Sequence, residues 1–192
     1  GLLYCSPVTA FKASNNHGVF ATKELLITFT SDFNYLYNDK GSGASKDLSL
    51  YRPIPPIGYK MVGDFAARDY INRSKDANVV MVLRPNPNYV PSPGEPAYNN
   101  KPALKHPINY EIIWCNSGGD EPGNVCVYKL IAPAGYRALG DVFDGSFGGS
   151  SSGLPSLDSY WCVREDLVAS GEPIDGQTQG IIWDTAYTDS DV

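Results

Sequence analysis

Apolar residues occur in short runs along the chain, separated by clusters of glycine, proline and polar residues. Two clear examples are 24–30 and 78–83, which are rich in the branched and aromatic residues favoured in strands. With 13 Tyr, 19 Gly and 15 Pro in 192 residues, turns must be frequent. No sustained 3.6-residue period occurs, and only 64–70 and 165–169 have room for one helical turn. The pattern predicts an all-β protein.

The chain also repeats itself. A shift of 77 residues superposes two segments that each read as a strand, a Gly-rich polar tip, a second strand, Pro-x-Gly-Tyr and Gly-Asp. A match at a fixed spacing is typical of folds built from copies of one unit. A third opening, Gly180–Asp184, repeats the Ile-Ile-Trp of Glu111–Cys115. The superposed positions are Tyr37 with Trp114, Asp39 with Asn116, Gly41 with Gly118, Tyr51 with Tyr128, Gly58-Tyr59 with Gly135-Tyr136, and Gly63-Asp64 with Gly140-Asp141.

Each unit reads as a β-hairpin with a glycine tip, followed by a proline-stiffened crossing. One hairpin cannot bury its apolar face alone, whereas three hairpins around a shared axis can. We therefore expect one domain over residues 1–192, with an all-β, β-prism-like fold that is a pseudo-threefold repeat of Gly-rich hairpins. Tyr37, Trp114 and Trp183 are the expected fillers of the shared core. The units span about 24–84 and 108–167, with a partial third unit at 180–192 that lacks a return strand. Either the N-terminal strands complete this third unit or the natural protein is longer, and we expect a longer protein.

Composition narrows the classes of partner. The chain carries 15 Lys and Arg against 21 Asp and Glu, a net charge of −6. This balance lacks the basic surface that grips a phosphate backbone, so we expect no nucleic acid partner. No apolar run reaches the roughly 20 residues that a membrane-spanning helix needs.

The cysteines indicate the compartment. There are four of them without any Cys-x-x-Cys, which favours disulfides over zinc. Cys115 and Cys126 flank the second hairpin tip, so we expect a bond across it, which leaves Cys5 to pair with Cys162. Asn72 begins an Asn-Arg-Ser glycosylation sequon. Together these features predict an extracellular protein or a protein of the secretory or vacuolar lumen.

Three sequence elements together resemble the Vps62-related family of fungi and plants. They are the Gly-rich hairpin, the Pro-x-Gly-Tyr step with its Gly-Asp, and the block Gly153-Leu-Pro-Ser-Leu-Asp-Ser-Tyr-Trp-Cys-Val-Arg-Glu-Asp-Leu167. Within that block, we expect Arg164, Glu165 and Asp166 to form surface ion pairs. The Gly-rich motif is also similar to β-prism domains attached to membrane-attack-type toxins and to vesicle-sorting subunits. The family name implies vacuolar sorting and no established chemistry.

Few residues suit catalysis. His17 and His106 lie in turn-like or proline-rich segments without an orienting partner nearby in sequence, so we expect ordinary loop side chains. No His-Glu-x-x-His, Gly-x-Ser-x-Gly or P-loop occurs. Two carboxylates could hydrolyse glycosides only if fixed about 5 to 10 Å apart. The acidic stretch 184–191 lacks EF-hand spacing, although its oxygens suit Ca²⁺. We expect no enzyme activity and no cofactor, with Ca²⁺ left as an alternative.

The hairpin tips carry the candidate binding site. Sugar hydroxyls both donate and accept hydrogen bonds, so a Gly-rich turn beside an acidic side chain suits a carbohydrate. The alternative is that these glycines only permit tight hairpins. The candidate ligand-binding residues are Asp39, Gly41, Ser42, Gly43, Asn116, Gly118, Gly119, Asp120 and Asp184.

Three functions follow from these features. The first is a non-enzymatic, lectin-like protein that binds a glycan or a glycoprotein through the hairpin tips. The second is a docking domain of a toxin or of a vacuolar or vesicle sorting protein, with a membrane or a protein as its partner. A hydrolase that uses the acidic loops ranks last.

Overall fold

The structure, a computed structural model, describes residues 18–70, 80–116, 124–145 and 153–169. Several positions that the sequence singled out lie outside these residues, and so does the predicted third unit at 180–192. These positions are Cys5, His17, Asn72, Gly118, Gly119, Asp120, Trp183 and Asp184.

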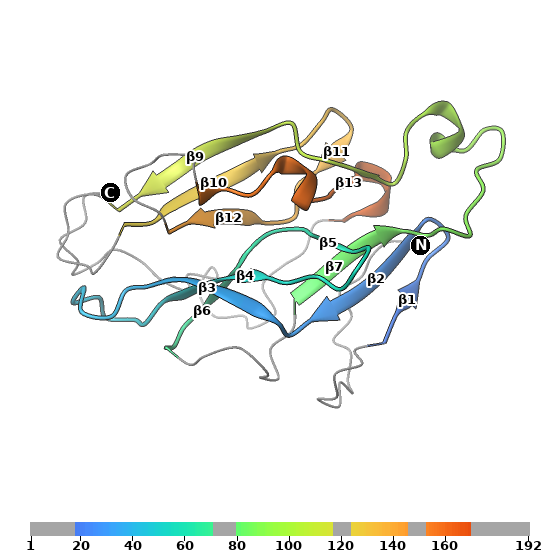
Figure 1. The fold of residues 1–192 in the computed structure, drawn as a ribbon. Coiled ribbons are helices and arrows are strands. Elements are labelled where there is room, and N and C mark those ends of the chain that lie inside the picture. The colour runs from blue at the N-terminus through green and yellow to red at the C-terminus, as the bar shows by residue number, and fades with distance from the viewer. Residues whose placement is uncertain (1–17, 71–79, 117–123, 146–152, 170–192) are drawn as a thin grey trace.

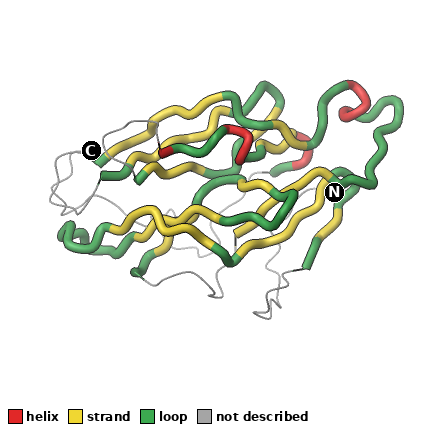
Figure 2. Tube along the Cα trace, viewed as in Figure 1, coloured by secondary structure: helices red, strands yellow, loops and turns green. Residues whose placement is uncertain are grey.

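Short strands make up the regular structure, which confirms the all-β expectation (Figure 2). The helical segments among the described residues are single 3₁₀ turns. The strands are β1 (Phe20–Ala21), β2 (Leu25–Thr30), β3 (Phe33–Asn38), β4 (Ser49–Pro53), β5 (Lys60–Met61), β6 (Phe65–Ala67), β7 (Val80–Pro85), β8 (Leu104–Lys105), β9 (Asn109–Cys115), β10 (Cys126–Ile131), β11 (Tyr136–Arg137), β12 (Asp141–Asp144) and β13 (Cys162–Arg164). The turns are η1 (Pro96–Asn99), η4 (Leu157–Ser159) and η5 (Glu165–Leu167).

The strand pairing repeats along the chain. Within the described residues the sheets have the orders β1-β2-β7-β5, β3-β4-β6, β11-β13-β8 and β12-β10-β9. Strands β2, β7 and β5 of the first unit correspond to β8, β13 and β11 of the second, and β3, β4 and β6 correspond to β9, β10 and β12. Both β3 and β9 even contain an irregularity at the same place, at Leu36 and at Ile113. The 77-residue sequence repeat therefore folds into a repeated pattern of hydrogen bonds.

The two units form two facing layers (Figure 1). Their apolar side chains meet between the layers, where Leu25 and Leu83 of the first unit share a cluster with Leu104 and Val163 of the second. Tyr37 lies in another shared cluster, against which Trp114 packs. The two described members of the predicted aromatic core therefore lie at the same apolar cluster. The prism-like, threefold arrangement stays a prediction, because it depends on the third unit.

Each proline-stiffened crossing ends in the same tight turn. The amide of Tyr59 donates to the carbonyl of Pro56 at 3.0 Å, and the amide of Tyr136 donates to Pro133 at 3.1 Å. The intervening Gly58 and Gly135 have φ angles of 86° and 82°, a region that side chains with a Cβ rarely adopt. The glycine of the repeated Gly-Tyr pair is thus required by the turn.

The Gly-Asp steps of the two units lie against each other. A Cβ atom on Gly63 would lie 2.9 Å from the Cα of Gly140, so this contact needs glycine. Beside it, the amide of Asp64 donates to the carbonyl of Asp141 at 2.8 Å. Of the two possible helical turns, 165–169 holds the 3₁₀ turn η5, whereas 64–70 contains β6, because that segment pairs with β4.

Candidate functional site

Asp39, the acidic residue at the base of the first hairpin tip, is buried, with 1% of its surface exposed. Its Oδ1 accepts hydrogen bonds from the amide of Leu48 at 2.9 Å and from the hydroxyl of Tyr70 at 2.7 Å. Its own amide donates to the carbonyl of Leu48 at 3.2 Å. Asp39 therefore closes the base of the tip and does not present its carboxylate to solvent.

Asn116 does the same in the second hairpin. It is 3% exposed, its amide donates to the carbonyl of Val125 at 3.0 Å, and its Oδ1 accepts from the amide of Val125. The 77-residue shift carries Asp39 to Asn116 and Leu48 to Val125. We name this arrangement the hairpin clasp. Its occurrence in both units favours the alternative that these positions serve to build tight hairpins.

The rest of the first tip is a compact turn. Gly41 and Gly43 are exposed, and Ser42 is half-buried. The amide of Ser42 donates to the carbonyl of Asp39 at 2.9 Å, and its Oγ accepts from the amide of Ala44 at 3.1 Å. The turn therefore uses part of the hydrogen-bonding capacity that the sequence assigned to a sugar.

The predicted disulfide across the second hairpin is present. Cys115 and Cys126 are paired in the β9–β10 register and joined by a bond with a Cα–Cα distance of 4.0 Å. Cys162 is a free cysteine in the structure, and Cys5 lies outside the described residues, so the link between them stays a prediction. Cys162 lies on β13, the middle strand of its sheet, where it is fully buried and burial raises the pKa of its thiol to about 11.

A buried ion pair connects the two layers. The guanidinium of Arg52 donates to both carboxylate oxygens of Asp64, at 3.2 and 3.0 Å, and to the carbonyl of Phe143 at 2.5 Å. Asp64 also accepts from the amide of Phe143 at 2.9 Å and from the hydroxyl of Tyr160 at 3.2 Å. Burial raises the pKa of the Asp64 carboxyl, and the Arg52 hydrogen bonds oppose that effect. With every contact directed inward, this pair is a structural junction.

Arg164 forms a second junction, and the expectation of a surface ion pair is wrong for it. The residue is 5% exposed. Its guanidinium makes a two-bond contact with Glu24, at 3.0 and 2.6 Å, and another with Asp166, at 2.6 and 3.1 Å. The Arg164 hydrogen bond lowers the pKa of Asp166. Since Glu24 precedes β2 and Arg164 ends β13, the contact connects the start of the first unit to the end of the second.

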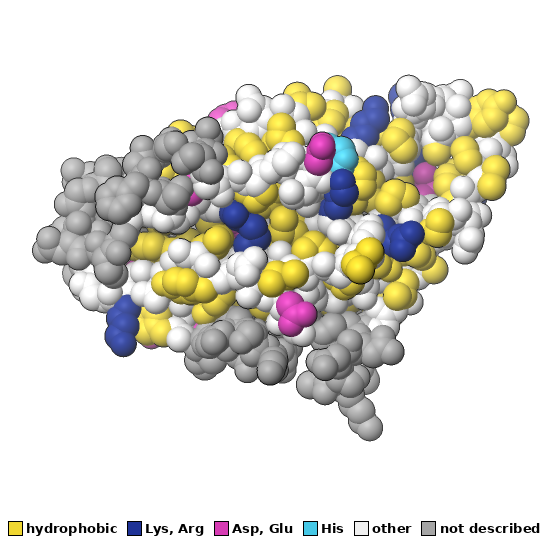
Figure 3. All heavy atoms as spheres, viewed as in Figure 1, with side chains coloured by type: hydrophobic (Ala, Val, Ile, Leu, Met, Phe, Trp, Pro, Cys, Tyr) yellow, Lys and Arg dark blue, Asp and Glu magenta, His cyan; other side chains and the backbone are white. Residues whose placement is uncertain are grey.

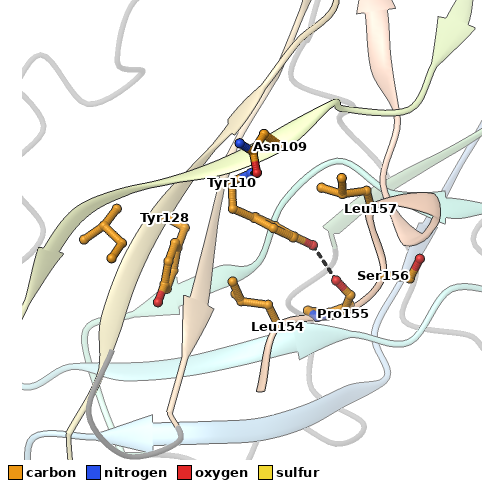
Figure 4. A pocket seen from close by; sticks show the side chains of 8 residues that line it. Asn109, Tyr110, Tyr128, Leu154, Pro155, Ser156 and Leu157 are labelled. Carbon is orange, nitrogen blue, oxygen red and sulfur yellow. Dashed lines mark hydrogen bonds between the residues drawn. The ribbon is translucent and has the colours of Figure 1, made fainter. Parts of the chain in front are cut away.

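An open pocket of about 530 Å³ lies beside β9 and β10. Figure 4 shows Tyr110 reaching across it from β9 toward the segment 154–157, where its hydroxyl donates to the carbonyl of Pro155 at 2.7 Å. The Tyr110 and Tyr128 rings are 6.2 Å apart in an edge-to-face arrangement. We name this pocket the Tyr110 groove; its lining residues are Asn109, Tyr110, Ile112, Tyr128, Leu154, Pro155, Ser156 and Leu157.

The lining of the Tyr110 groove mixes apolar surface with neutral polar groups. Tyrosine rings and aliphatic side chains form most of the wall, and Asn109 and Ser156 are exposed at its edge. Burial raises the pKa of Tyr110 to about 12, so its hydroxyl stays neutral and keeps the proton that it donates to Pro155. Among the described residues that line the groove there is no Asp, Glu, Lys or Arg. It therefore suits a neutral ligand that has both apolar faces and hydroxyl or amide groups.

Sequence reasoning did not find the Tyr110 groove. Its second wall comes from the Leu-Pro-Ser-Leu part of the 153–167 block, which the sequence marked only as a family-like feature.

The histidine of the same region, His106, is half-buried: its ring stacks on Trp161 at 4.2 Å between ring centroids, and Nδ1 lies 2.9 Å from the carbonyl of Tyr160.

The described residues contain neither a metal-binding cluster nor a membrane-spanning helix. No group of three or more His, Cys, Asp and Glu side chains in this part of the chain could hold a metal ion. The acidic stretch 184–191 lies outside it. Within the same residues, no helix has the length and apolar character needed to cross a membrane.

Comparisons with known proteins give a family and one structural relative. A search of curated proteins finds no match. A crystal structure of GNIP1Aa from Chromobacterium piscinae is similar, with a TM-score of 0.58 and 29% sequence identity. The similarity covers 78% of this chain and 26% of that one, so the chain spans about a quarter of its length. The family profile of vacuolar protein sorting-associated protein 62 matches residues 5–190, nearly the whole sequence. The chain therefore belongs to the Vps62 family.

Proposed function

We propose that this chain is a non-enzymatic, lectin-like recognition domain that binds carbohydrate in the Tyr110 groove. The observation that carries the proposal is the lining of that groove, in which tyrosine rings stand beside uncharged polar groups. Family membership and the GNIP1Aa likeness fit a binding or docking role of this kind.

The chemistry of sugars matches this lining. The C–H faces of a pyranose ring are apolar and pack on aromatic side chains, while its hydroxyls need partners that donate and accept. The half-buried ring of Tyr110 and the exposed side chain of Ile112 offer the first kind of contact, and Asn109 and Ser156 offer the second. The volume of about 530 Å³ is within the range of small-ligand sites, roughly 300–1,000 Å³.

The groove replaces the hairpin tips as the proposed site. In the hairpin clasp, Asp39 and Asn116 use their side-chain oxygens for the backbone of their own hairpins. The structural roles of two buried acids also support a binding protein without enzyme activity. The Asp39 carboxylate accepts a backbone hydrogen bond within its hairpin, and the Asp64 carboxylate is paired with Arg52. Neither is placed as a free acid or base in a cleft.

An extracellular or vacuolar setting is part of the proposal. The Cys115–Cys126 disulfide is typical of proteins that mature in an oxidising compartment, where glycans and glycoproteins are abundant partners. No cofactor is needed for this role. Calcium at 184–191 stays an untested alternative.

A glycan array probed with the purified 192-residue protein tests the proposal. Ile112 lines the groove and is 53% exposed; we expect Ile112→Lys to place a charge in the groove and reduce glycan binding at least about tenfold. Its neighbour Ile113 is also 53% exposed and does not line the groove, so Ile113→Lys is the matched control. Binding that is equal in both variants, or an array without any signal, would contradict carbohydrate recognition at this site.

A docking domain is the second candidate function. The observation that favours it is that the chain covers only 26% of GNIP1Aa, as expected for a recognition unit within a larger protein. Figure 3 shows the cationic side chains on one face as separate spots among hydrophobic ones, which with a net charge of −6 does not favour simple attraction to anionic lipid. Binding to lipid vesicles that free sugars do not inhibit would support docking over lectin activity.

A further inference from the structure

The crossing between β4 and β5 ends in a rigid turn that carries an exposed isoleucine. Ile57 is 100% exposed, and Ile54 in the same crossing is 43% exposed. Pro55 and Pro56 restrict the backbone, and the amide of Tyr59 closes the turn on the carbonyl of Pro56 at 3.0 Å. The structure therefore holds Ile57 in a fixed position in water, where no described residue covers its side chain.

The turn itself does not need an isoleucine at this place. The 77-residue shift carries Ile57 to Ala134, in a turn with the same hydrogen bond and the same positive φ at its glycine. Single exposed apolar residues are common on protein surfaces, so Ile57 alone does not indicate a partner. A second observation, the charge beside it, does.

That charge belongs to Arg84. Its guanidinium lies against Gly58, where an added Cβ would be 3.3 Å from the Arg84 Nη1, and it lies over the Tyr59 ring at 5.6 Å from the ring centroid. Among the described residues, no carboxylate forms an ion pair with Arg84. We name the surface of Ile54, Ile57, Tyr59 and Arg84 the Ile57 tip.

The second unit shows which partners Arg84 lacks. β5 pairs with β7 one residue before Arg84, and β11 pairs with β13 one residue before Arg164, at strand positions that the 77-residue shift superposes. Arg84 and Arg164 are therefore equivalent. Arg164 binds the carboxylates of Glu24 and Asp166, whereas the residue two positions after Arg84 is the neutral Asn86. The Ile57 tip thus has a cation without the acids that its counterpart binds.

We propose that the Ile57 tip binds the surface of an anionic lipid bilayer, with Ile57 inserted below the headgroups and Arg84 at the lipid phosphates. The proposal specifies the partner of the docking candidate and rests on that function. A guanidinium binds phosphate through the same paired hydrogen bonds that Arg164 makes to carboxylates. A side chain that is exposed on all sides loses its contact with water only in a partner that encloses it, as the apolar boundary of a bilayer does.

The net charge of −6 is compatible with this mode of binding. It opposes attraction of the whole molecule to anionic lipid, so the charge of Arg84 acts only locally. The insertion of Ile57 then has to supply the rest of the affinity. Tyr59, an aromatic residue with a polar hydroxyl, suits the headgroup level between the two.

Sedimentation of the 192-residue protein with lipid vesicles tests the proposal. We expect binding to phosphatidylcholine vesicles that contain about 30% phosphatidylserine, and weaker binding to pure phosphatidylcholine. Ile57→Ala, which reproduces the turn of the second unit, should lower the partition coefficient at least about fivefold. Ile108→Ala is the matched control, because Ile108 is 62% exposed and lies outside the tip. Arg84→Gln should remove the preference for phosphatidylserine.

Three results would overturn the proposal. The first is no binding to either kind of vesicle, which would also exclude lipid docking. The second is binding that Ile57→Ala and Ile108→Ala reduce equally, which would retain docking but place it elsewhere. The third is a dimer, detected by sedimentation velocity, that Ile57→Ala dissociates, because a second copy would then cover the tip. The Ile57 tip shares no residue with the Tyr110 groove, so all three results are independent of glycan binding there.

Discussion

At the scale of single residues, the hairpin clasp explains why the tips contain an acid or an amide. Asp39 and Asn116 accept a hydrogen bond from the chain nine residues later and are almost fully buried. Both side chains have an oxygen at the same position, which is all that the clasp requires. A polar residue in a Gly-rich turn can therefore be a building element even where it resembles a ligand.

The clasp leads to a prediction about Asp39. We expect Asp39→Ala to lower the free energy of unfolding by about 1–3 kcal/mol, because the buried amide of Leu48 and the hydroxyl of Tyr70 lose their acceptor. Asp39→Asn should cost less, since it keeps that oxygen and reproduces the side chain at Asn116. Urea unfolding of the two variants checks this. Equal losses in both would show that the charge, and not the acceptor oxygen, is what matters.

At the scale of elements, the two hairpins share a register but are fastened differently. Asn38 pairs with Ser49 in the first hairpin just as Cys115 pairs with Cys126 in the second. The second hairpin has a disulfide at this place. In the first, the Ser49 hydroxyl donates to the carbonyl of Asp69 at 2.5 Å. The Ser49 hydrogen bond thus connects β4 to the chain after β6, whereas the disulfide connects β9 to β10.

The shared register predicts that the disulfide can be transferred. We expect Asn38→Cys/Ser49→Cys to form a bond when oxidised and to raise stability by about 1–2 kcal/mol. A disulfide that closes a short loop contributes roughly 3 kcal/mol, and the loss of the Ser49 hydrogen bond costs about 1 kcal/mol of it. Thermal unfolding with and without reductant measures the gain, and the reduced double variant is the control. A bond that does not form, or forms and destabilises, would show that the two registers are not interchangeable.

At the scale of the whole molecule, the two layers are joined by an apolar core, the Gly63–Gly140 contact and two buried arginines. Arg52 and Arg164 each connect the two units of the chain. Buried ion pairs of this kind contribute little net stability but are costly to break, because a lone buried charge remains. They favour one relative placement of the layers over others.

The glycine contact gives a prediction at this scale. We expect Gly63→Ala to lower the free energy of unfolding by about 1–3 kcal/mol, because its Cβ would lie 2.9 Å from the backbone of the other layer. Gly41→Ala is a control: its φ of 97° also disfavours alanine, but nothing lies within 4 Å of the added Cβ. Chemical denaturation compares them. A smaller loss at Gly63 than at Gly41 would contradict close packing of the layers.

The sequence by itself determined the local structure and the repeat. Strand-forming runs and Pro-x-Gly-Tyr turns depend on residues that are close together in the chain, and the 77-residue repeat is visible in the sequence itself. The all-β class and the Cys115–Cys126 bond could therefore be predicted. The Vps62 resemblance rested on a local block of residues in the same way.

Only the tertiary structure decided which polar residues are buried and which lie beside a pocket. In the sequence, Asp39 and Arg164 looked like surface residues, because the residues that bury them are distant in the chain. Tyr70 donates a hydrogen bond to Asp39, and Glu24 accepts one from Arg164. The Tyr110 groove likewise needs β9 and the segment 154–157 to meet across more than 40 residues of sequence. Such contacts arise from how the layers pack, and no spacing along the chain encodes them directly.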